Sequence, residues 1–132
     1  MNATRILLVE DHPVNKMLCK NILKRNGYHV ETAENGLVAL EFLQKNPFDL
    51  IVSDIKMPVM TGLEMTTYIR TRFPKPVCLI PIIAYSSFDT DYDRIKAKEC
   101  GMNECLTKPS YPEELLLVIK RLTDQHLVLK AS

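Results

Sequence analysis

Acidic residues follow two of the most apolar segments of this 132-residue chain, where a charged side chain is costly to bury. Glu10 and Asp11 come at the end of "RILLVED" (5–11), and Asp54 ends "DLIVSD" (49–54). An ionised carboxylate in an apolar setting is destabilising unless a cation or hydrogen-bond donors meet it. Two more polar residues stand in comparable places: Ser86 ends the apolar segment 79–86, and Lys108 follows the segment 103–107.

Carboxylates that share one crevice repel each other and therefore call for a cation. Carboxylate oxygens without Cys or His ligands suit a hard ion, and Mg²⁺ commonly shares its positions with phosphoryl oxygens. Lys108 would add a point charge for the same phosphoryl group, and Ser86 a hydroxyl donor. A carboxylate can also act as the nucleophile and form an aspartyl-phosphate. Asp54 is the candidate, because it stands alone at the end of the middle strand.

Short apolar segments alternate with helical patterns along the whole chain. Strands are predicted at 5–10, 29–33, 49–54, 79–86 and 103–107. Helices are predicted from Pro13 to the Asn26-Gly27 stop, at 35–46, 61–73 and 89–101, and from Pro112 onward. Wholly apolar central strands indicate a parallel sheet covered on both faces, so the fold class is a doubly wound α/β domain. For the strand order 2-1-3-4-5, ligands bind at the carboxyl ends of the first and third strands.

Two helices show clear apolar faces. In the first helix the face is formed by Val14, Met17, Leu18 and Ile22, and in the last by Leu115, Val118, Ile119 and Leu122.

Composition limits the classes of protein. The chain is 46% hydrophobic and 25% charged with a net charge of +1, which fits one globular domain over 1–132 with a core at about 4–124. No basic patch predicts nucleic-acid binding, and no apolar run reaches the ~20 residues that span a bilayer. The pattern of the first residues, a short apolar segment that ends in acids, does not predict a signal peptide. The four cysteines lack metal-ligand spacing and are predicted to be reduced thiols in a cytoplasmic protein.

Four segments in this order carry a family resemblance: "LLVEDHPVN" (7–15), "DLIVSDIKMPVMTGLE" (49–64), "PIIAYSS" (81–87) and "CLTKPSYPEEL" (105–115). Together they resemble the receiver domain of two-component response regulators, a flavodoxin-like (βα)5 fold. The opening segment, with Asn15, is similar to the receivers attached to hybrid sensor histidine kinases.

The resemblance implies a role for each acidic residue. Asp54 would accept a phosphoryl group from the phosphohistidine of a histidine kinase or a phosphotransfer protein. Asp11 and Asp54 would bind Mg²⁺ directly, Glu10 through water, and Lys56 through its backbone carbonyl.

The resemblance also implies how the signal is produced and passed on. Ser86 would turn toward the phosphoryl group, Lys108 would pair with a phosphoryl oxygen, and the Lys108–Pro109 bond would be cis. The chain would be a signalling module rather than an enzyme, with slow self-dephosphorylation. Its output face would be formed by the fourth helix, the fifth strand and the fifth helix, and a phosphorylation-dependent dimer is an open expectation.

The sequence departs from the family pattern at Cys105, where many receivers carry an aromatic residue that moves on phosphorylation. We therefore expect the output to depend on Ser86 and the loop after it. A comparison of the 89–101 helix with and without a phosphoryl mimic tests this hypothesis.

Three other functions fit the residues less well. A haloacid-dehalogenase-type phosphohydrolase needs a second acid two residues after the nucleophile, where this chain has Lys56. A flavin or nucleotide binder needs a phosphate-binding loop after the first strand, where this chain has "EDHP". A pseudo-receiver that only binds partners would not need the complete set of acids.

Overall fold

A computed structural model describes residues 3–88, 90–108 and 110–131, with side chains up to residue 125. Its described strands form one five-stranded parallel sheet in the order β2-β1-β3-β4-β5, which confirms the predicted order and fold class. The strands are β1 (Arg5–Val9), β2 (His29–Ala33), β3 (Leu50–Ser53), β4 (Ile82–Ser86) and β5 (Glu104–Thr107).

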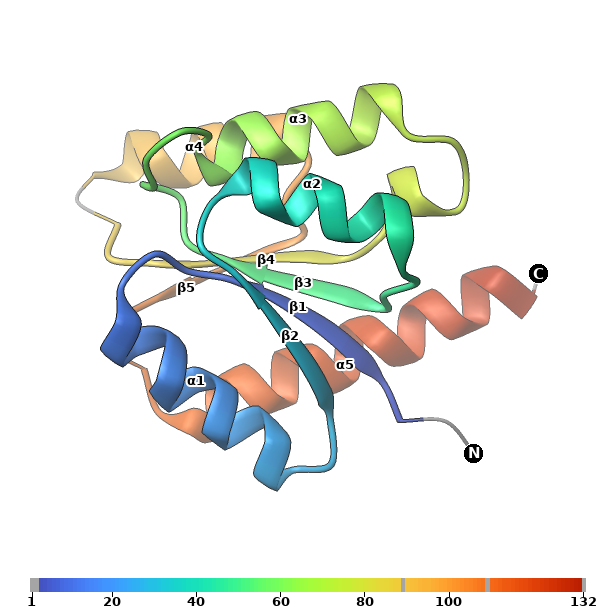
Figure 1. The fold of residues 1–132 in the computed structure, drawn as a ribbon, viewed down its shortest axis with the longest axis horizontal. Helices are drawn as coiled ribbons and strands as arrows, with labels where there is room; N and C mark the ends of the chain where they lie inside the picture. Colours follow the sequence, from blue (N-terminus) through green and yellow to red (C-terminus); the bar gives the residue numbers. More distant parts are fainter. Residues whose placement is uncertain (1–2, 89, 109, 132) are drawn as a thin grey trace.

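Helices cover both faces of the sheet. In Figure 1, α1 and α5 lie below the sheet, and α2, α3 and α4 lie above it. The helices are α1 (Pro13–Arg25), α2 (Gly36–Lys45), α3 (Gly62–Arg72), α4 (Asp91–Cys100) and α5 (Pro112–Ala131), with a short 3-10 helix η1 (Val77–Leu79). None of the helices within the described ranges is long and apolar enough to cross a bilayer.

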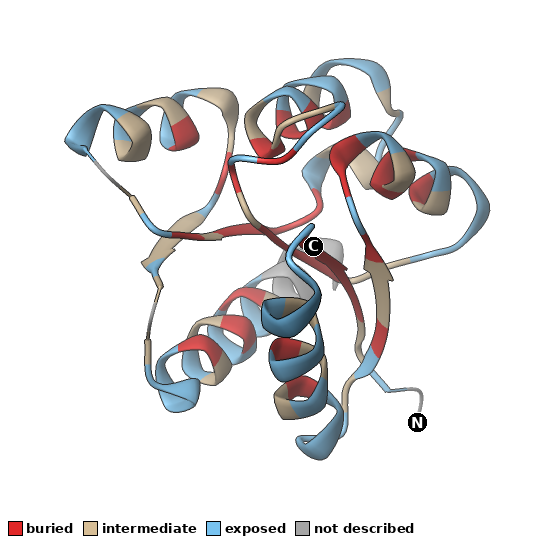
Figure 2. Cartoon of the chain, turned by 60° about the vertical axis from the view of Figure 1, so that its left-hand side comes forward, coloured by how far each residue is buried: buried red, intermediate tan, exposed pale blue. Residues whose placement is uncertain are grey.

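The sheet separates two apolar clusters. Alternate residues of each strand point to opposite faces, so Leu7 and Ile51 join the cluster under α2, α3 and α4, while Leu8 and Val52 join the one under α1 and α5. All four residues of β3 are buried, as the red strands in Figure 2 illustrate. This packing on both faces holds the end of β3 rigidly, and Asp54 follows it directly.

Local contacts fix the loop between β3 and α3. The Gly62 N–H donates to the Ile55 carbonyl at 2.8 Å, and a Cβ at Gly62 would lie 2.2 Å from the Asp54 carbonyl oxygen. Only glycine fits so close an approach. Thr61 and Glu64 then start α3 with a reciprocal capping box, each side chain accepting from the other's backbone N–H at 3.1 Å. The chain is thereby turned away from Asp54.

The α1 helix begins and ends as predicted, but its predicted apolar face is not the buried one. Val14, Met17 and Leu18 are each more than half exposed, whereas Cys19 and Leu23 are buried. The side chains of α1 that pack against the sheet are therefore shifted by one residue from the predicted apolar face. In α5 the predicted face is confirmed, since Leu115, Ile119 and Leu122 are buried.

The predicted strand 79–86 was too long at its start. Leu79 ends η1 and is 56% exposed, and β4 begins only at Ile82. Pro81 cannot donate to a strand ladder, although its carbonyl accepts from Ile51 at 2.9 Å.

Candidate functional site

The parallel strands bring three acidic side chains to one edge of the sheet. Carboxylate oxygens of Glu10, Asp11 and Asp54 all lie within 4.8 Å of one another. Glu10 is buried, Asp54 is partly buried and Asp11 is exposed. The sequence therefore placed these acids correctly at the ends of β1 and β3.

The Asp54 carboxylate is held by donors on one oxygen. Its Oδ1 accepts from the Ile55 N–H at 2.7 Å and from the Ser86 hydroxyl at 2.7 Å. Its Oδ2 lies 3.4 Å from the Lys108 ammonium. The side chain is 17% exposed, so it remains accessible while its orientation is fixed. Ser86 rather than its neighbour Ser87 contacts Asp54, and Ser87 is exposed at the rim of the adjacent cleft.

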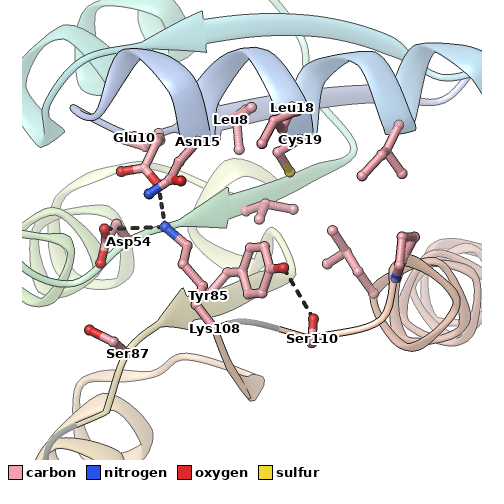
Figure 3. A pocket seen from close by; sticks show the side chains of 15 residues that line it. Leu8, Glu10, Asn15, Leu18, Cys19, Asp54, Tyr85, Ser87, Lys108 and Ser110 are labelled. Atoms are coloured by element: carbon pink, nitrogen blue, oxygen red, sulfur yellow. Dashed lines mark hydrogen bonds and ion pairs between the residues drawn. The ribbon is translucent and has the colours of Figure 1, made fainter.

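Lys108 supplies the positive charge for this cluster. Its backbone N–H donates to the Ser86 carbonyl at 2.9 Å, and its ammonium pairs with both Glu10 and Asp54 (Figure 3). Burial alone lowers the pKa of Lys108, but the hydrogen bond to Glu10 and the two negative charges outweigh it and raise that pKa. Burial is also the main cause that raises the pKa of Glu10. Lys108 is therefore held as a cation between two carboxylates.

His12, and not the acid pair, caps α1. Its Nδ1 accepts from the Asn15 N–H at 3.4 Å, which satisfies one of the free N–H groups at the start of the helix. The histidine is exposed.

Two predictions about the site stay predictions. Lys56 is exposed in the loop after β3, and the role of its carbonyl as a magnesium ligand is not decided by its position. The Lys108–Pro109 bond lies outside the described residues.

A cleft of about 490 Å³ runs from the acids along the sheet between α1 and α5. Glu10, Asp54 and Lys108 line its polar end, and Leu18, Cys19 and Leu115 belong to its apolar wall. Figure 3 shows the labelled side chains of both ends around the opening. Burial raises the pKa of Cys19 to about 11, so this thiol is a packing residue and not a nucleophile.

Tyr85 also lines this cleft, and the sequence reasoning did not single it out. Its ring centroid is 5.3 Å from the Lys108 Nζ. A signal was available, because Tyr85 directly precedes Ser86 and must point to the opposite face of β4.

Cys105, at the position where the family pattern has an aromatic residue, is half-buried on β5. It packs against the same apolar cluster as Phe88. The Arg94 guanidinium lies 4.6 Å from the Phe88 ring centroid and donates to the Thr107 hydroxyl. Phe88 therefore places an aromatic ring near this region from the loop after β4.

The donor set of the acid cluster fits a hard divalent cation. All three candidate ligands are carboxylates, and neither Cys nor His contributes to the group. The Lys108 ammonium pairs with two of the three carboxylates, those of Glu10 and Asp54. The cluster therefore keeps excess negative charge that a cation can balance.

A family model for the response regulator receiver domain matches residues 6–120. The match favours the receiver prediction over the phosphohydrolase and flavin-binder alternatives, since it spans the acids, the serine and the lysine together.

Several curated relatives are sensor histidine kinases. The sensor histidine kinase RcsC of Escherichia coli is 36% identical over 104 residues, covering 79% of this chain and 10% of that protein. The sensor histidine kinase GacS of Pseudomonas protegens is 34% identical over 125 residues, covering 92% of this chain and 13% of that protein. The chain thus spans only a small part of the length of these relatives.

Solved structures agree with the fold. The chemotaxis response regulator CheY4 of Vibrio cholerae has a TM-score of 0.83 and 33% identity, over 92% of this chain and 99% of that one. The receiver domain of sensor histidine kinase PA1611 from Pseudomonas aeruginosa has a TM-score of 0.85 and 32% identity, over 93% of this chain and 99% of that one. The latter structure holds a magnesium ion in its active site cleft.

Proposed function

Because the chain belongs to the receiver domain family of two-component response regulators, we propose that Asp54 is the residue that accepts the phosphoryl group. The observation that carries this proposal is the environment of the Asp54 carboxylate. Two donors orient Oδ1 at 2.7 Å each, and the Lys108 ammonium lies beside Oδ2. A nucleophilic carboxylate needs this combination of fixed orientation and nearby positive charge.

The transfer step follows from these contacts. Asp54 Oδ2 forms a bond to the phosphorus of a phosphohistidine, and the phosphorus–nitrogen bond breaks. The electron pair returns to the imidazole nitrogen, which takes a proton from solvent. Lys108 leaves its pairing with Glu10 and contacts a phosphoryl oxygen, and the Ser86 hydroxyl turns from Asp54 to another.

We propose that Asp11 and Asp54 hold Mg²⁺ directly, with Glu10 acting through water and Lys56 through its carbonyl. The all-carboxylate cluster supports this assignment, as does the magnesium ion in the active site cleft of the PA1611 receiver domain. When bound, Mg²⁺ supplies positive charge that offsets the carboxylates and the phosphoryl oxygens.

The partner that donates the phosphoryl group is proposed to be a histidine kinase or a histidine phosphotransfer domain. The exposed apolar residues of α1 support this, because Val14, Met17 and Leu18 are 53%, 54% and 53% exposed next to the acids at the end of β1. An exposed apolar patch beside a reactive group is typical of a protein-docking surface.

The chain itself is a signalling module of two-component systems and not a classical enzyme. We propose that residues 1–132 form a single receiver domain with a core at about 4–124, which acts in the cytoplasm and dephosphorylates itself slowly. The hydrogen bond from the His29 N–H to the Thr4 carbonyl and the burial of Leu122 support these core limits. Kinase activity would belong to a longer parent protein.

We propose that the output face consists of α4, β5 and α5, and that a phosphorylation-dependent dimer would form there. Tyr92 and Ile95 on α4 and Tyr111 and Leu117 near or on α5 are exposed apolar residues that support a contact surface.

Mass spectrometry tests the acceptor assignment. The protein is incubated with Mg²⁺ and acetyl phosphate, and the intact mass is expected to rise by one phosphoryl group. Asp54→Asn is expected to abolish the gain, while Asp91→Asn, an exposed acid on α4, is expected to keep it. Labelling that persists in Asp54→Asn would overturn the assignment, and absence of labelling in the unchanged protein would favour the pseudo-receiver alternative.

A further inference from the structure

The Lys108 side chain has a second neighbour besides the carboxylates. Its Nζ lies 5.3 Å from the centroid of the Tyr85 ring, within the range of a cation–π contact. Figure 3 shows the lysine stem running beside this ring toward Glu10 and Asp54. Tyr85 is half-buried and packs against the apolar cluster under α1 and α5, and this packing fixes the position of its ring.

The other end of Tyr85 is also held. Its hydroxyl oxygen accepts a hydrogen bond from the Ser110 hydroxyl at 3.1 Å. Ser110 lies two residues after Lys108, while the Lys108 backbone N–H is bound to the Ser86 carbonyl. Tyr85 and Ser86, which are consecutive in β4, therefore contact the segment around Lys108 at three points. These points are the Lys108 backbone N–H, the Lys108 ammonium and the Ser110 hydroxyl.

A lysine in this place needs such support. The side chain has four flexible bonds, and about 2 kcal/mol of rotamer entropy opposes holding it in one place. The neighbouring cleft of about 490 Å³ leaves room for the ammonium to move away from Asp54. Glu10 and Asp54 attract the ammonium, but Glu10 draws it toward β1 rather than toward an incoming phosphoryl group. The Tyr85 ring restricts it from the β4 side.

We propose that Tyr85 is a positioning residue whose ring holds the Lys108 ammonium at Asp54 during phosphoryl transfer. This inference rests on the proposed role of Lys108. A cation–π contact of this kind is worth about 0.5–1 kcal/mol, which corresponds to a rate effect of about two- to fivefold.

A double-mutant cycle tests the proposal. Initial rates of acetyl phosphate labelling are compared for the unchanged protein, Tyr85→Leu, Tyr85→Phe, Lys108→Ala and the double variant Tyr85→Leu/Lys108→Ala. Tyr85→Leu is expected to slow labelling about two- to fivefold, Tyr85→Phe to restore most of the loss, and Tyr85→Leu to have no further effect in the Lys108→Ala background. The affinity for beryllofluoride is expected to fall by the same factor in Tyr85→Leu.

Tyr68→Leu is the matched control. The centroid of the Tyr68 ring lies 5.7 Å from the Arg72 Cζ on α3, so the substitution removes a comparable cation–π contact away from the acids. Its labelling rate is expected to stay unchanged.

The outcomes separate the two proposals. If Tyr85→Leu slows labelling as much without Lys108 as with it, the ring acts on the fold and the inference is wrong. An unchanged rate in Tyr85→Leu, together with a slow Lys108→Ala, also overturns it. If Lys108→Ala itself labels at the normal rate, the role of Lys108 in the proposed function fails instead.

Discussion

At the scale of single residues, the proposed acceptor carboxylate of Asp54 is defined by the groups that surround it. Asp54 alone would be a charge at the end of an apolar strand. The Ile55 N–H and the Ser86 hydroxyl fix one oxygen, and Lys108 lies beside the other. Because Ser86 ends β4 and Lys108 follows β5, the contacts around Asp54 depend on the register of β3, β4 and β5.

Val59 is a second residue with an unusual environment. It has a φ of 68° and is 75% exposed. Its two neighbours close a tight turn, in which the Met60 N–H donates to the Pro58 carbonyl at 2.7 Å. A three-residue turn with positive φ is rare and strained, especially for a β-branched residue. The strain persists because neighbouring bonds hold the loop, including the one from the Gly36 N–H to the Met60 carbonyl at 3.0 Å.

We predict that Val59→Asn stabilises the protein. Asparagine tolerates the left-handed region, so the free energy of unfolding is expected to rise by about 1 kcal/mol and the melting temperature by roughly 4 °C. Thermal unfolding followed by circular dichroism measures this. Val14→Asn, which replaces an exposed valine of a helix, should bring no such gain. Equal or lower stability of Val59→Asn would show that the turn is not strained.

At the scale of helices and strands, the fold could largely be predicted from sequence. The apolar segments, such as the one that forms β3, predicted the parallel sheet. Pro13 predicted the start of the first helix, and Gly101 predicted the end of the fourth. The buried side of α1 could not be predicted, because Leu18 and Cys19 are adjacent apolar residues and only tertiary contact decides which one faces the sheet. Tyr85 was missed for a related reason: its partner Lys108 is adjacent only through the pairing of β4 with β5.

The segment proposed to carry the output signal begins next to Ser86. Phe88 packs against the core two residues later, and Arg94 of α4 lies over its ring and donates to Thr107 of β5. The small Cys105 leaves no aromatic residue on β5 at the usual position. A movement of Ser86 toward a phosphoryl group would therefore reach α4 and β5 through Phe88.

We predict that this connection fails in Phe88→Ala. In the unchanged protein, beryllofluoride is expected to alter amide hydrogen exchange in 91–100, and in Phe88→Ala that change is expected to shrink while beryllofluoride still binds. Phe48→Ala removes a comparable ring, which packs against the same apolar cluster beneath Arg5, and should retain the response. A full response in Phe88→Ala would mean that the signal takes another route.

At the scale of the whole molecule, the strand order places the acids at the switch point of the sheet. The helices after β1 and β3 leave in opposite directions there, α1 to one face and α3 to the other (Figure 1). The same arrangement concentrates negative charge, because Glu10, Asp11 and Asp54 converge and Lys108 pairs with only two of them. The native state is therefore one that gains from a bound cation, whereas the unfolded chain has no such cluster.

Binding of Mg²⁺ is accordingly predicted to stabilise the fold. A ligand that binds only the native state adds about 2.7 kcal/mol at a concentration 100 times its dissociation constant. Thermal unfolding with increasing Mg²⁺ should show a rising melting temperature that excess EDTA reverses. Asp11→Asn is expected to remove most of this shift, while Asp91→Asn is expected to keep it. Because the carboxylates of the metal-free cluster repel one another, Asp11→Asn should also be at least as stable as the unchanged protein in EDTA. If the rise in melting temperature with Mg²⁺ survives in Asp11→Asn, the cation binds elsewhere. If Asp11→Asn is less stable than the unchanged protein in EDTA, Asp11 is held by contacts other than the metal.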